Sequence, residues 1–349
     1  MTATRIPVKI PLLVEVGSGS TALARGRVAL PEIDWIMAQA DIDTINRLKA
    51  ERNAVVLAHN YMTPDIYHGV ADYTGDSLGL ARLAAKTEAD VIVFAGVHFM
   101  AETAKVTCPD KIVLIPDPLA GCSLAESMTG ADVRELRRRY PGVPVVAYVN
   151  TSAEVKAEVD ICCTSGNAVE VVSSLGVDRV IFVPDQYLGK WVASQLPEID
   201  VILWDGACMV HERFTGVELR RFRSETPGAQ IIAHPECPPD VLAEADYVGS
   251  TAGMIRFVQD LAGTGRPPTG PAPQVVMVTE CSMADNVALE NPGVEFIRPC
   301  SLCPHMKLIT LTKIRRSLET MTHEVILPVG VGDRAKVSVE RMLAVGGGR

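Results

Sequence analysis

Short runs of β-branched and aliphatic residues alternate with longer amphipathic stretches along the chain. Three runs read VVLAHNY, VVAYVNT and IIAHPEC, and they place His59, Tyr148 and His234 at intervals of 89 and 86 residues. Each run is followed 17 or 18 residues later by a small hydroxyl residue that opens an apolar helical pattern. These hydroxyl residues are Ser77, Ser165 and Thr251. Self-similarity at a nearly constant interval predicts one structural unit repeated three times.

Two further apolar runs follow in each unit. The second runs read DVIVFAGV, RVIFVPDQ and QVVMVTE, and the third runs read KIVLIPD, DVILWDG and VEFIRP after a helix-length gap. Cysteine comes within several residues of each third run, at Cys122, Cys208, and Cys300 or Cys303. Counted from His59, Tyr148 and His234, these cysteines lie 63, 60, and 66 or 69 residues further along the chain. Polar residues and cysteines therefore recur at the ends of predicted strands.

Strands that alternate with helices predict α/β units with mainly parallel sheets. We therefore expect an α/β protein of three three-layer α/β/α domains related by pseudo-threefold symmetry. The helix–strand–helix pattern after Cys303 is expected to pack back on the first domain, beside residues 32–55. The predicted domains are 32–119 plus 305–349, 120–206 and 207–304. Because open α/β sheets bind ligands at the carboxyl ends of their strands, one shared central site is predicted.

Composition is that of a globular protein with ample core, since 48% of the 349 residues are hydrophobic and 21% are charged. The net charge of -9 argues against nucleic acid as a partner, because nucleic-acid binding usually leaves a basic footprint. No stretch approaches the roughly 20 apolar residues that span a bilayer. Residues 1–31 make a poor signal peptide. We therefore expect a loosely ordered leader and a cytoplasmic protein without a membrane partner.

The nine cysteines indicate metal binding or catalysis more than structural disulfides. Cys108, Cys162 and Cys281 are interpreted as small buried hydrophobes. One thiolate from each unit makes three soft ligands, which select zinc, copper(I) or iron–sulfur clusters. A 4Fe–4S cluster generally takes four thiolates, so three ligands leave one iron open for Lewis-acid chemistry. Cys300 and Cys303 compete for the third position, and the spacing slightly favours Cys300.

The three hydroxyl residues lie near predicted helix N-termini, where backbone N–H groups bind phosphate or carboxylate. Each one alone is more simply an N-cap, but three in register around a cluster favour an anion-binding set. His59, and His234 with Glu236, lie where general acids and bases are needed. Tyr61 follows two residues after His59. In the second unit, Tyr148 and Asn150 occupy the equivalent position, which indicates substrate binding rather than proton transfer. His211, three residues after Cys208, is expected to orient the cluster without binding it directly.

In combination these motifs resemble the quinolinate synthase (NadA) family of de novo NAD biosynthesis. The resemblance covers roughly residues 45–345. It rests on AHNY with GDS, GVHFMAETAK, IPDPLAGCS, YVNT, DICCTSGNAV, PDQYLG, GACMVH, HPEC and CPHMK in this order. It implies condensation of iminoaspartate with dihydroxyacetone phosphate to quinolinate, with loss of phosphate and two waters.

The resemblance also implies a 4Fe–4S cluster at the junction of the three domains. The third ligand of the family precedes the Met of a CxxM motif, which matches Cys303 and Met306 and makes Cys300 an auxiliary thiol. Of the cysteines here, only the Cys300–Cys303 pair has the spacing of the reversible disulfide that some members carry. The implied cluster ligands are Cys122, Cys208 and Cys303. The implied site residues are His59, Tyr61, Ser77, Tyr148, Asn150, Ser165, His234, Glu236 and Thr251, of which His59, Tyr61 and Glu236 would move protons.

Two other classes of function are compatible with these residues. A zinc-dependent lyase of the aldolase type would use the three thiolates as ligands of a catalytic zinc ion. A non-enzymatic iron–sulfur redox sensor would have no need of the anion-binding hydroxyls or the paired His and Glu. Iminoaspartate is unstable, so a transient L-aspartate oxidase or dehydrogenase is expected as a partner beside the small-molecule substrates.

Overall fold

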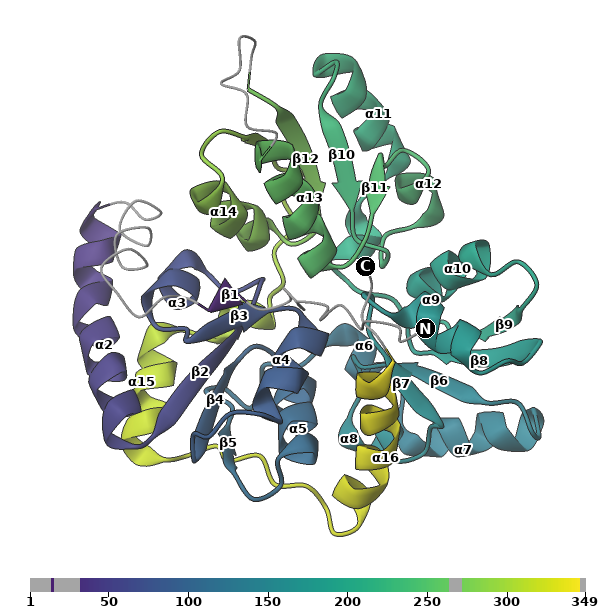
Figure 1. The fold of residues 1–349 in the computed structure, drawn as a ribbon, viewed down its shortest axis with the longest axis horizontal. Helices are drawn as coiled ribbons and strands as arrows, with labels where there is room; N and C mark the ends of the chain where they lie inside the picture. Colours follow the sequence, from purple (N-terminus) through teal and green to yellow (C-terminus); the bar gives the residue numbers. More distant parts are fainter. Residues whose placement is uncertain (1–13, 16–31, 264–271, 346–349) are drawn as a thin grey trace, which may run out of the picture.

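The computed structural model describes residues 14–15, 32–263 and 272–345, and it contains three separate sheets that form three lobes (Figure 1). The predicted leader lies outside the described residues except for β1 (Val14–Glu15), which pairs antiparallel with β3. Residues 264–271 also lie outside them.

Each sheet contains four parallel strands in the same order, and in the first sheet the antiparallel β1 adds a fifth strand at the edge beside β3. The first sheet runs β3 (Tyr73–Gly75), β2 (Ala54–His59), β4 (Val91–Ala95) and β5 (Ile112–Leu114). The second runs β7 (Ile161–Cys163), β6 (Val145–Tyr148), β8 (Arg179–Val183) and β9 (Asp200–Leu203). The third runs β11 (Tyr247–Val248), β10 (Gln230–Ala233), β12 (Gln274–Val278) and β13 (Glu295–Ile297). The prediction of three α/β units is therefore confirmed.

Helices cover the sheets. In the first lobe they are α2 (Glu32–Glu51), α3 (Pro64–Gly69), α4 (Ser77–Ala84) and α5 (His98–Thr107). The second lobe has α6 (Ser123–Glu126), α7 (Gly130–Arg139), α8 (Ala153–Lys156), α9 (Ala168–Ser174) and α10 (Gln186–Gln195). The third has the short helix η1 (His211–Arg213), α11 (Gly216–Glu225), α12 (Pro239–Leu242), α13 (Thr251–Gly263) and α14 (Cys281–Glu290). The chain ends with η2 (Met306–Leu308), α15 (Leu311–Thr320) and α16 (Val331–Ala344).

The strands are continuous apolar runs because both faces of each sheet are covered. In the third lobe, alternate strand residues point to opposite faces, as the period of two requires. Ile232 and Met277 pack with α13 and α14, whereas Ile231 and Val278 pack with α11 and α12. This alternation gives the lobe its three layers, visible at the top of Figure 1.

The C-terminal segment returns across two lobes. Helix α15 packs against α2, as predicted, and Arg315 pairs with Asp41 at 2.8 Å. The predicted strand HEVILPVG is reduced to one antiparallel bridge between Glu324 and Leu114. Helix α16 contacts α5 of the first lobe but also α8 and β7 of the second. The exact domain boundaries stay a prediction.

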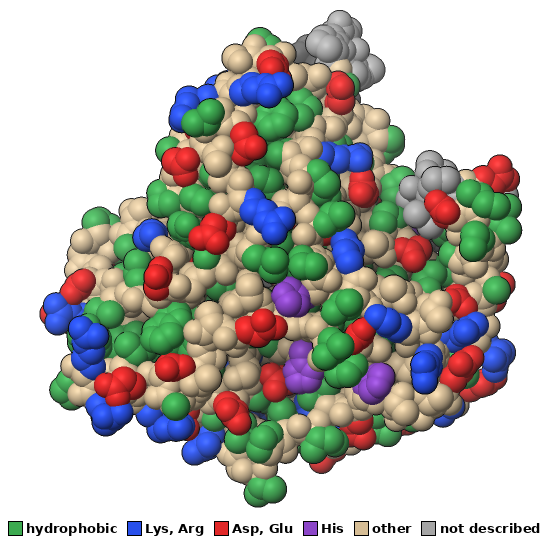
Figure 2. Space-filling view, turned by 180° about the vertical axis from the view of Figure 1, so that it is seen from behind, with side chains coloured by type: hydrophobic (Ala, Val, Ile, Leu, Met, Phe, Trp, Pro, Cys, Tyr) green, Lys and Arg blue, Asp and Glu red, His purple; other side chains and the backbone are tan. Residues whose placement is uncertain are grey.

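Acidic and basic side chains are interspersed over the face drawn in Figure 2, and histidine side chains gather near its centre, where the lobes meet. Within the described part of the chain, no helix combines the length and the apolar character needed to cross a membrane.

Candidate active site

One cavity lies where residues from all three lobes converge. Strands β2, β6 and β10 end at this point, beside the place where the strand order of each sheet reverses, and such a point is where open α/β sheets bind ligands. All twelve residues expected in the site or as cluster ligands line the cavity. They are His59, Tyr61, Ser77, Cys122, Tyr148, Asn150, Ser165, Cys208, His234, Glu236, Thr251 and Cys303.

The three cysteines reach the cavity on loops that follow the third apolar run of each unit. Cys122 is the residue before α6, Cys208 follows β9 and Cys303 follows β13. The first two loops are joined by Ser123, whose hydroxyl donates to Ala207 O and accepts from Met209 N, each at 3.1 Å. Three soft donors on one cavity suit a thiolate-bound metal group.

Burial controls the protonation of these thiols. It raises the pKa of Cys122 to about 12 and also raises the pKa of Cys208 and Cys303. Metal ligands must be thiolates, so loading a metal group here would displace protons. The donor set therefore fits an iron–sulfur group in number and chemistry.

The hydroxyl residues lie at helix N-termini, but neighbouring residues provide the caps. Asp76 accepts from Gly79 N at 2.8 Å before α4, and Ser250 accepts from Gly253 N at 3.2 Å before α13. Ser77 and Thr251 are consequently the first residues of their helices and line the cavity. N-capping therefore does not account for these two side chains.

Ser165 lies in the turn before α9, where its hydroxyl is 3.1 Å from His234 Nε2. Burial lowers the pKa of His234 to about 3, although Glu236 opposes the shift. The ring is therefore neutral at pH 7. It stacks on His211 with a centroid distance of 4.7 Å, which links the third unit to the loop that carries Cys208.

Glu236 is a buried carboxylate with two partners. Its Oε2 lies 2.7 Å from His211 Nδ1, and its Oε1 accepts a short hydrogen bond from Tyr148. Burial raises the pKa of Glu236, but His234, His211 and these hydrogen bonds outweigh burial and hold it below its ordinary value. Burial and the nearby carboxylate raise the pKa of Tyr148 well above its ordinary value, so its hydroxyl remains a donor.

The loop after β2 is fastened to the third lobe. Asn60 donates to Thr251 Oγ1 at 2.9 Å, and Asn286 on α14 donates to Met62 O at 2.8 Å. Within the loop, Tyr61 packs edge-on against His59 with a centroid distance of 4.6 Å. Burial lowers the pKa of His59 to about 3 and raises that of Tyr61 well above its ordinary value. Near pH 7 the two side chains are a neutral imidazole and a protonated phenol.

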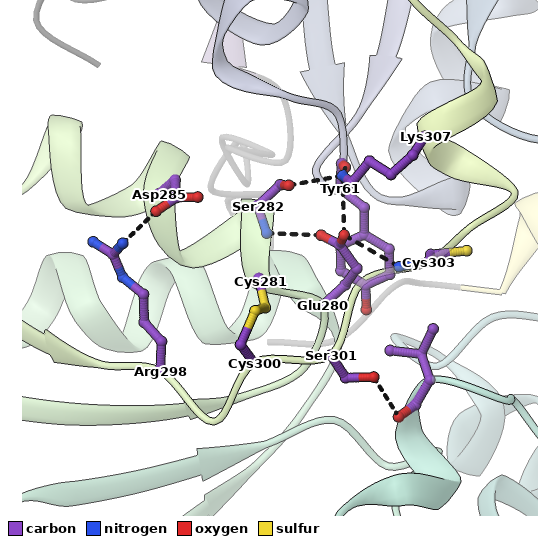
Figure 3. Close-up of a disulfide and its surroundings, with 11 residues drawn as sticks. Tyr61, Glu280, Cys281, Ser282, Asp285, Arg298, Cys300, Ser301, Cys303 and Lys307 are labelled. Atoms are coloured by element: carbon purple, nitrogen blue, oxygen red, sulfur yellow. Dashed lines mark hydrogen bonds and ion pairs between the residues drawn. A yellow bond between two sulfur atoms is a disulfide. The ribbon is translucent and has the colours of Figure 1, made fainter. Parts of the chain in front are cut away.

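Lys307 and Glu280 connect this loop to the loop of the third cysteine. Lys307 Nζ lies 2.9 Å from Glu280 Oε1 and donates to Tyr61 O at 2.8 Å. Glu280 also accepts from Ser282 N at 2.8 Å and from Cys303 N at 3.4 Å (Figure 3). One buried carboxylate thus sets the start of α14 and the position of Cys303.

A disulfide joins Cys281 to Cys300 beside this ion pair (Figure 3). One expectation was therefore wrong: Cys281 is not simply a small buried hydrophobe, because it is bonded to Cys300. The physical reason is that the first residue of α14 lies against the segment that follows β13. With Cys300 in the disulfide, Cys303 is the free cysteine of the pair and lines the cavity.

Several residues of the site were not predicted from the sequence. Thr279, at the end of β12, lies 2.6 Å from Tyr61 Oη and 2.9 Å from His211 Nε2. His305 and Asp76 also line the cavity. A histidine two residues after a ligand cysteine and an acidic residue before Ser77 were the available signals. Thr279 had none beyond its place at a strand end.

Comparison with known proteins agrees with this geometry. The family described as quinolinate synthetase A protein (NadA) matches residues 43–344. A protein named quinolinate synthase 2 from Mesorhizobium japonicum is 60% identical over 316 residues, which is 90% of this chain and 94% of the relative. The quinolinate synthase of Agrobacterium fabrum is 56% identical over 328 residues, 93% of this chain and 92% of the relative. The chain therefore belongs to the quinolinate synthase (NadA) family.

Proposed function

We propose that the chain condenses iminoaspartate with dihydroxyacetone phosphate to form quinolinate, with loss of phosphate and two waters. Quinolinate synthase activity, a step of NAD biosynthesis, follows from the close similarity to relatives of that name over about nine-tenths of the chain. The observation that carries the proposal is that all twelve residues expected from the family motifs line one cavity.

Cys122, Cys208 and Cys303 would hold a 4Fe–4S cluster. When bound through three thiolates, such a cluster supplies an iron with an open position that can act as a Lewis acid. The supporting features are the three soft donors, one from each unit, and the loops that hold them in place through Ser123 and Glu280.

Substrate binding is assigned to the neutral donors of the cavity. Ser77 and Thr251 open helices whose N-terminal N–H groups and dipoles favour phosphate and carboxylate oxygens. Ser165 lies in the turn before α9 and would add a third hydroxyl to this set. Tyr148 and Asn150, after β6, would orient the carboxylates of the substrate.

Proton transfer is assigned to His59, Tyr61 and Glu236. Their states near pH 7 are complementary: His59 is neutral, Tyr61 keeps its proton, and Glu236 is an anion. A neutral imidazole and a carboxylate can accept protons, and a phenol can donate one. These are the transfers that loss of phosphate, keto–aldo isomerisation and dehydration require.

Three further assignments belong to the proposal. The domains are placed at 32–119 plus 305–349, 120–206 and 207–304. The reaction is placed in the cytoplasm. Unstable iminoaspartate would be delivered by a transient L-aspartate oxidase or dehydrogenase.

Glu236→Gln tests the assignment, because it keeps the shape of the side chain but removes the negative charge. We expect the anaerobically purified variant to keep its brown colour and about four irons per chain, while quinolinate formation is lost. Activity equal to that of the unsubstituted protein would contradict the role of Glu236. A colourless, active protein that contains zinc would contradict the cluster and would favour the zinc-dependent lyase.

A further inference from the structure

A path of hydrogen-bonded side chains follows the wall of the cavity and connects two of the hydroxyls that line it. Tyr61 Oη lies 2.6 Å from Thr279 Oγ1, which lies 2.9 Å from His211 Nε2. His211 Nδ1 lies 2.7 Å from Glu236 Oε2, and Tyr148 donates to the other oxygen of Glu236. The path therefore begins in the first unit at Tyr61 and ends in the second at Tyr148.

Between Tyr61 and Glu236 the donors of this path all point towards Glu236, and Tyr148 donates to Glu236 from the other end. Glu236 is an acceptor because its carboxylate is ionised, so the nearby Nδ1 of His211 carries the hydrogen. Nδ1 also lies 3.2 Å from Cys208 Sγ, but Glu236 is the nearer acceptor. With the ring hydrogen on Nδ1, Nε2 is an acceptor and takes the hydrogen of the Thr279 hydroxyl. The remaining lone pairs of Thr279 Oγ1 accept from Tyr61, whose hydroxyl remains protonated because burial raises its pKa.

Thr279 is the link that holds the path together. Its side chain is 1% exposed and is not part of the cavity lining, so it has no access to a substrate. Tyr61 Oη lies 3.4 Å from His211 Nε2, which is long for a hydrogen bond. Without the hydroxyl of Thr279, only this weak contact would connect the phenol of Tyr61 to His211 and Glu236.

We propose that Thr279 is a positioning residue whose hydroxyl joins Tyr61 to His211 and Glu236 in one path for proton transfer. This inference rests on the proposed function, in which Tyr61 and Glu236 move protons. It adds the route between them and a residue that no family motif indicated.

The transfer conserves protons. A substrate proton arrives at Tyr61 Oη while the proton of that phenol moves to Thr279 Oγ1. The proton of Thr279 moves to His211 Nε2, and the proton on His211 Nδ1 moves to the Glu236 carboxylate. Tyr61, Thr279 and His211 each gain one proton and lose one, so only Glu236 changes its charge. The same shifts in reverse return the proton to the substrate.

The test compares Thr279→Val, which keeps the shape but removes the hydroxyl, with Thr279→Ser, which keeps the hydroxyl. We expect Thr279→Val to lower kcat by about tenfold to a hundredfold, within the range that positioned proton transfer supplies. KM should stay within about twofold, because Thr279 does not touch substrate, and the solvent isotope effect on kcat should rise. Thr279→Ser should stay within about threefold of the unsubstituted enzyme.

Thr103→Val is the matched control. Thr103 is also buried, and its hydroxyl donates to Phe99 O at 2.7 Å within α5, away from the path. Its kcat should be unchanged. In a Tyr61→Phe background, Thr279→Val should add no further loss, because the start of the path is already missing.

Two results would overturn the inference: an unchanged kcat in Thr279→Val, or equal losses in Thr279→Val and Thr279→Ser, which would indicate packing alone. If Thr279→Val does not load its cluster, Thr279→Ala removes the same hydroxyl without adding volume, and the same outcomes apply to it. Failure of the proposed function looks different, because the unsubstituted enzyme would then form no quinolinate or Glu236→Gln would remain active.

Discussion

Acid should weaken the fold well above the range in which carboxylates titrate, because two buried histidines are held neutral. Burial lowers the pKa of both His59 and His234 from 6.5 to about 3. Between these values the unfolded chain binds protons that the folded protein does not bind. The free energy of unfolding therefore falls as the pH falls from about 6.5 towards 3.

The size of the effect follows from the lowered pKa values. Each pH unit below 6.5 costs about 1.4 kcal/mol for each histidine. At pH 5.5 the two residues together should cost about 3 kcal/mol relative to pH 7.5. Glu236 adds little in this window, because a carboxylate with a lowered pKa loses its contribution only below the ordinary value near 4.5.

Urea unfolding of the cluster-free protein at pH 7.5 and 5.5 measures this difference, with tryptophan fluorescence as the signal. His234→Gln should reduce the loss by about half. His323→Asn is the control, because His323 is exposed and its positive φ of 65° suits asparagine. Equal stability of the unsubstituted protein at the two pH values, or an undiminished loss in His234→Gln, would refute the reasoning.

Two further predictions concern the loops of the second and third cysteine ligands. Cys300→Ser removes the bond to Cys281, which closes a loop with a sequence separation of 19, and should lower the free energy of unfolding by about 3 kcal/mol. A reductant should have the same effect on the unsubstituted protein and none on the variant; a reductant without effect would show that the disulfide does not stabilise the fold. Gly206→Ala should cost about 1 to 3 kcal/mol and lower the iron content, because its Cβ would clash with Pro184 O beside the Cys208 loop. Gly293→Ala, with nothing within 4 Å of the new Cβ, should change neither quantity, and equal iron contents in the two variants would contradict the clash.

Nine of the strands could be predicted because they lie in continuous apolar runs, most of them buried on both faces, although β9 and β13 are only partly buried. Strands β3, β7 and β11 could not, because two or three residues outside a longer apolar run carry too little pattern. Tyr73–Gly75 also lies in a polar stretch that reads as a turn. The order of the strands in each sheet could not be predicted from the sequence either, because it depends on the direction in which each connecting helix crosses the sheet.

The cavity was predictable because the repeat placed similar residues at equivalent strand ends. Contacts between different units were not, because they depend on how the lobes pack. The spacing favoured Cys300 as the third ligand, and only the family motif indicated Cys303. The partner of Cys300 is the first residue of α14, and disulfide connectivity cannot be deduced from sequence alone. The bonds of Thr279 to Tyr61 and His211 likewise cross between units.

The return of the C-terminal segment has a consequence for the order of assembly on the ribosome. Domains generally fold as they emerge, N-terminal first. Here α15 packs on α2 and α16 packs across α5 and β7, so the first two lobes stay open until the last part of the chain has been made. Cys303 emerges only shortly before these helices. A nascent chain therefore presents Cys122 and Cys208 long before Cys303, and the proposed cluster could be held by all three thiolates only after the third lobe has been made.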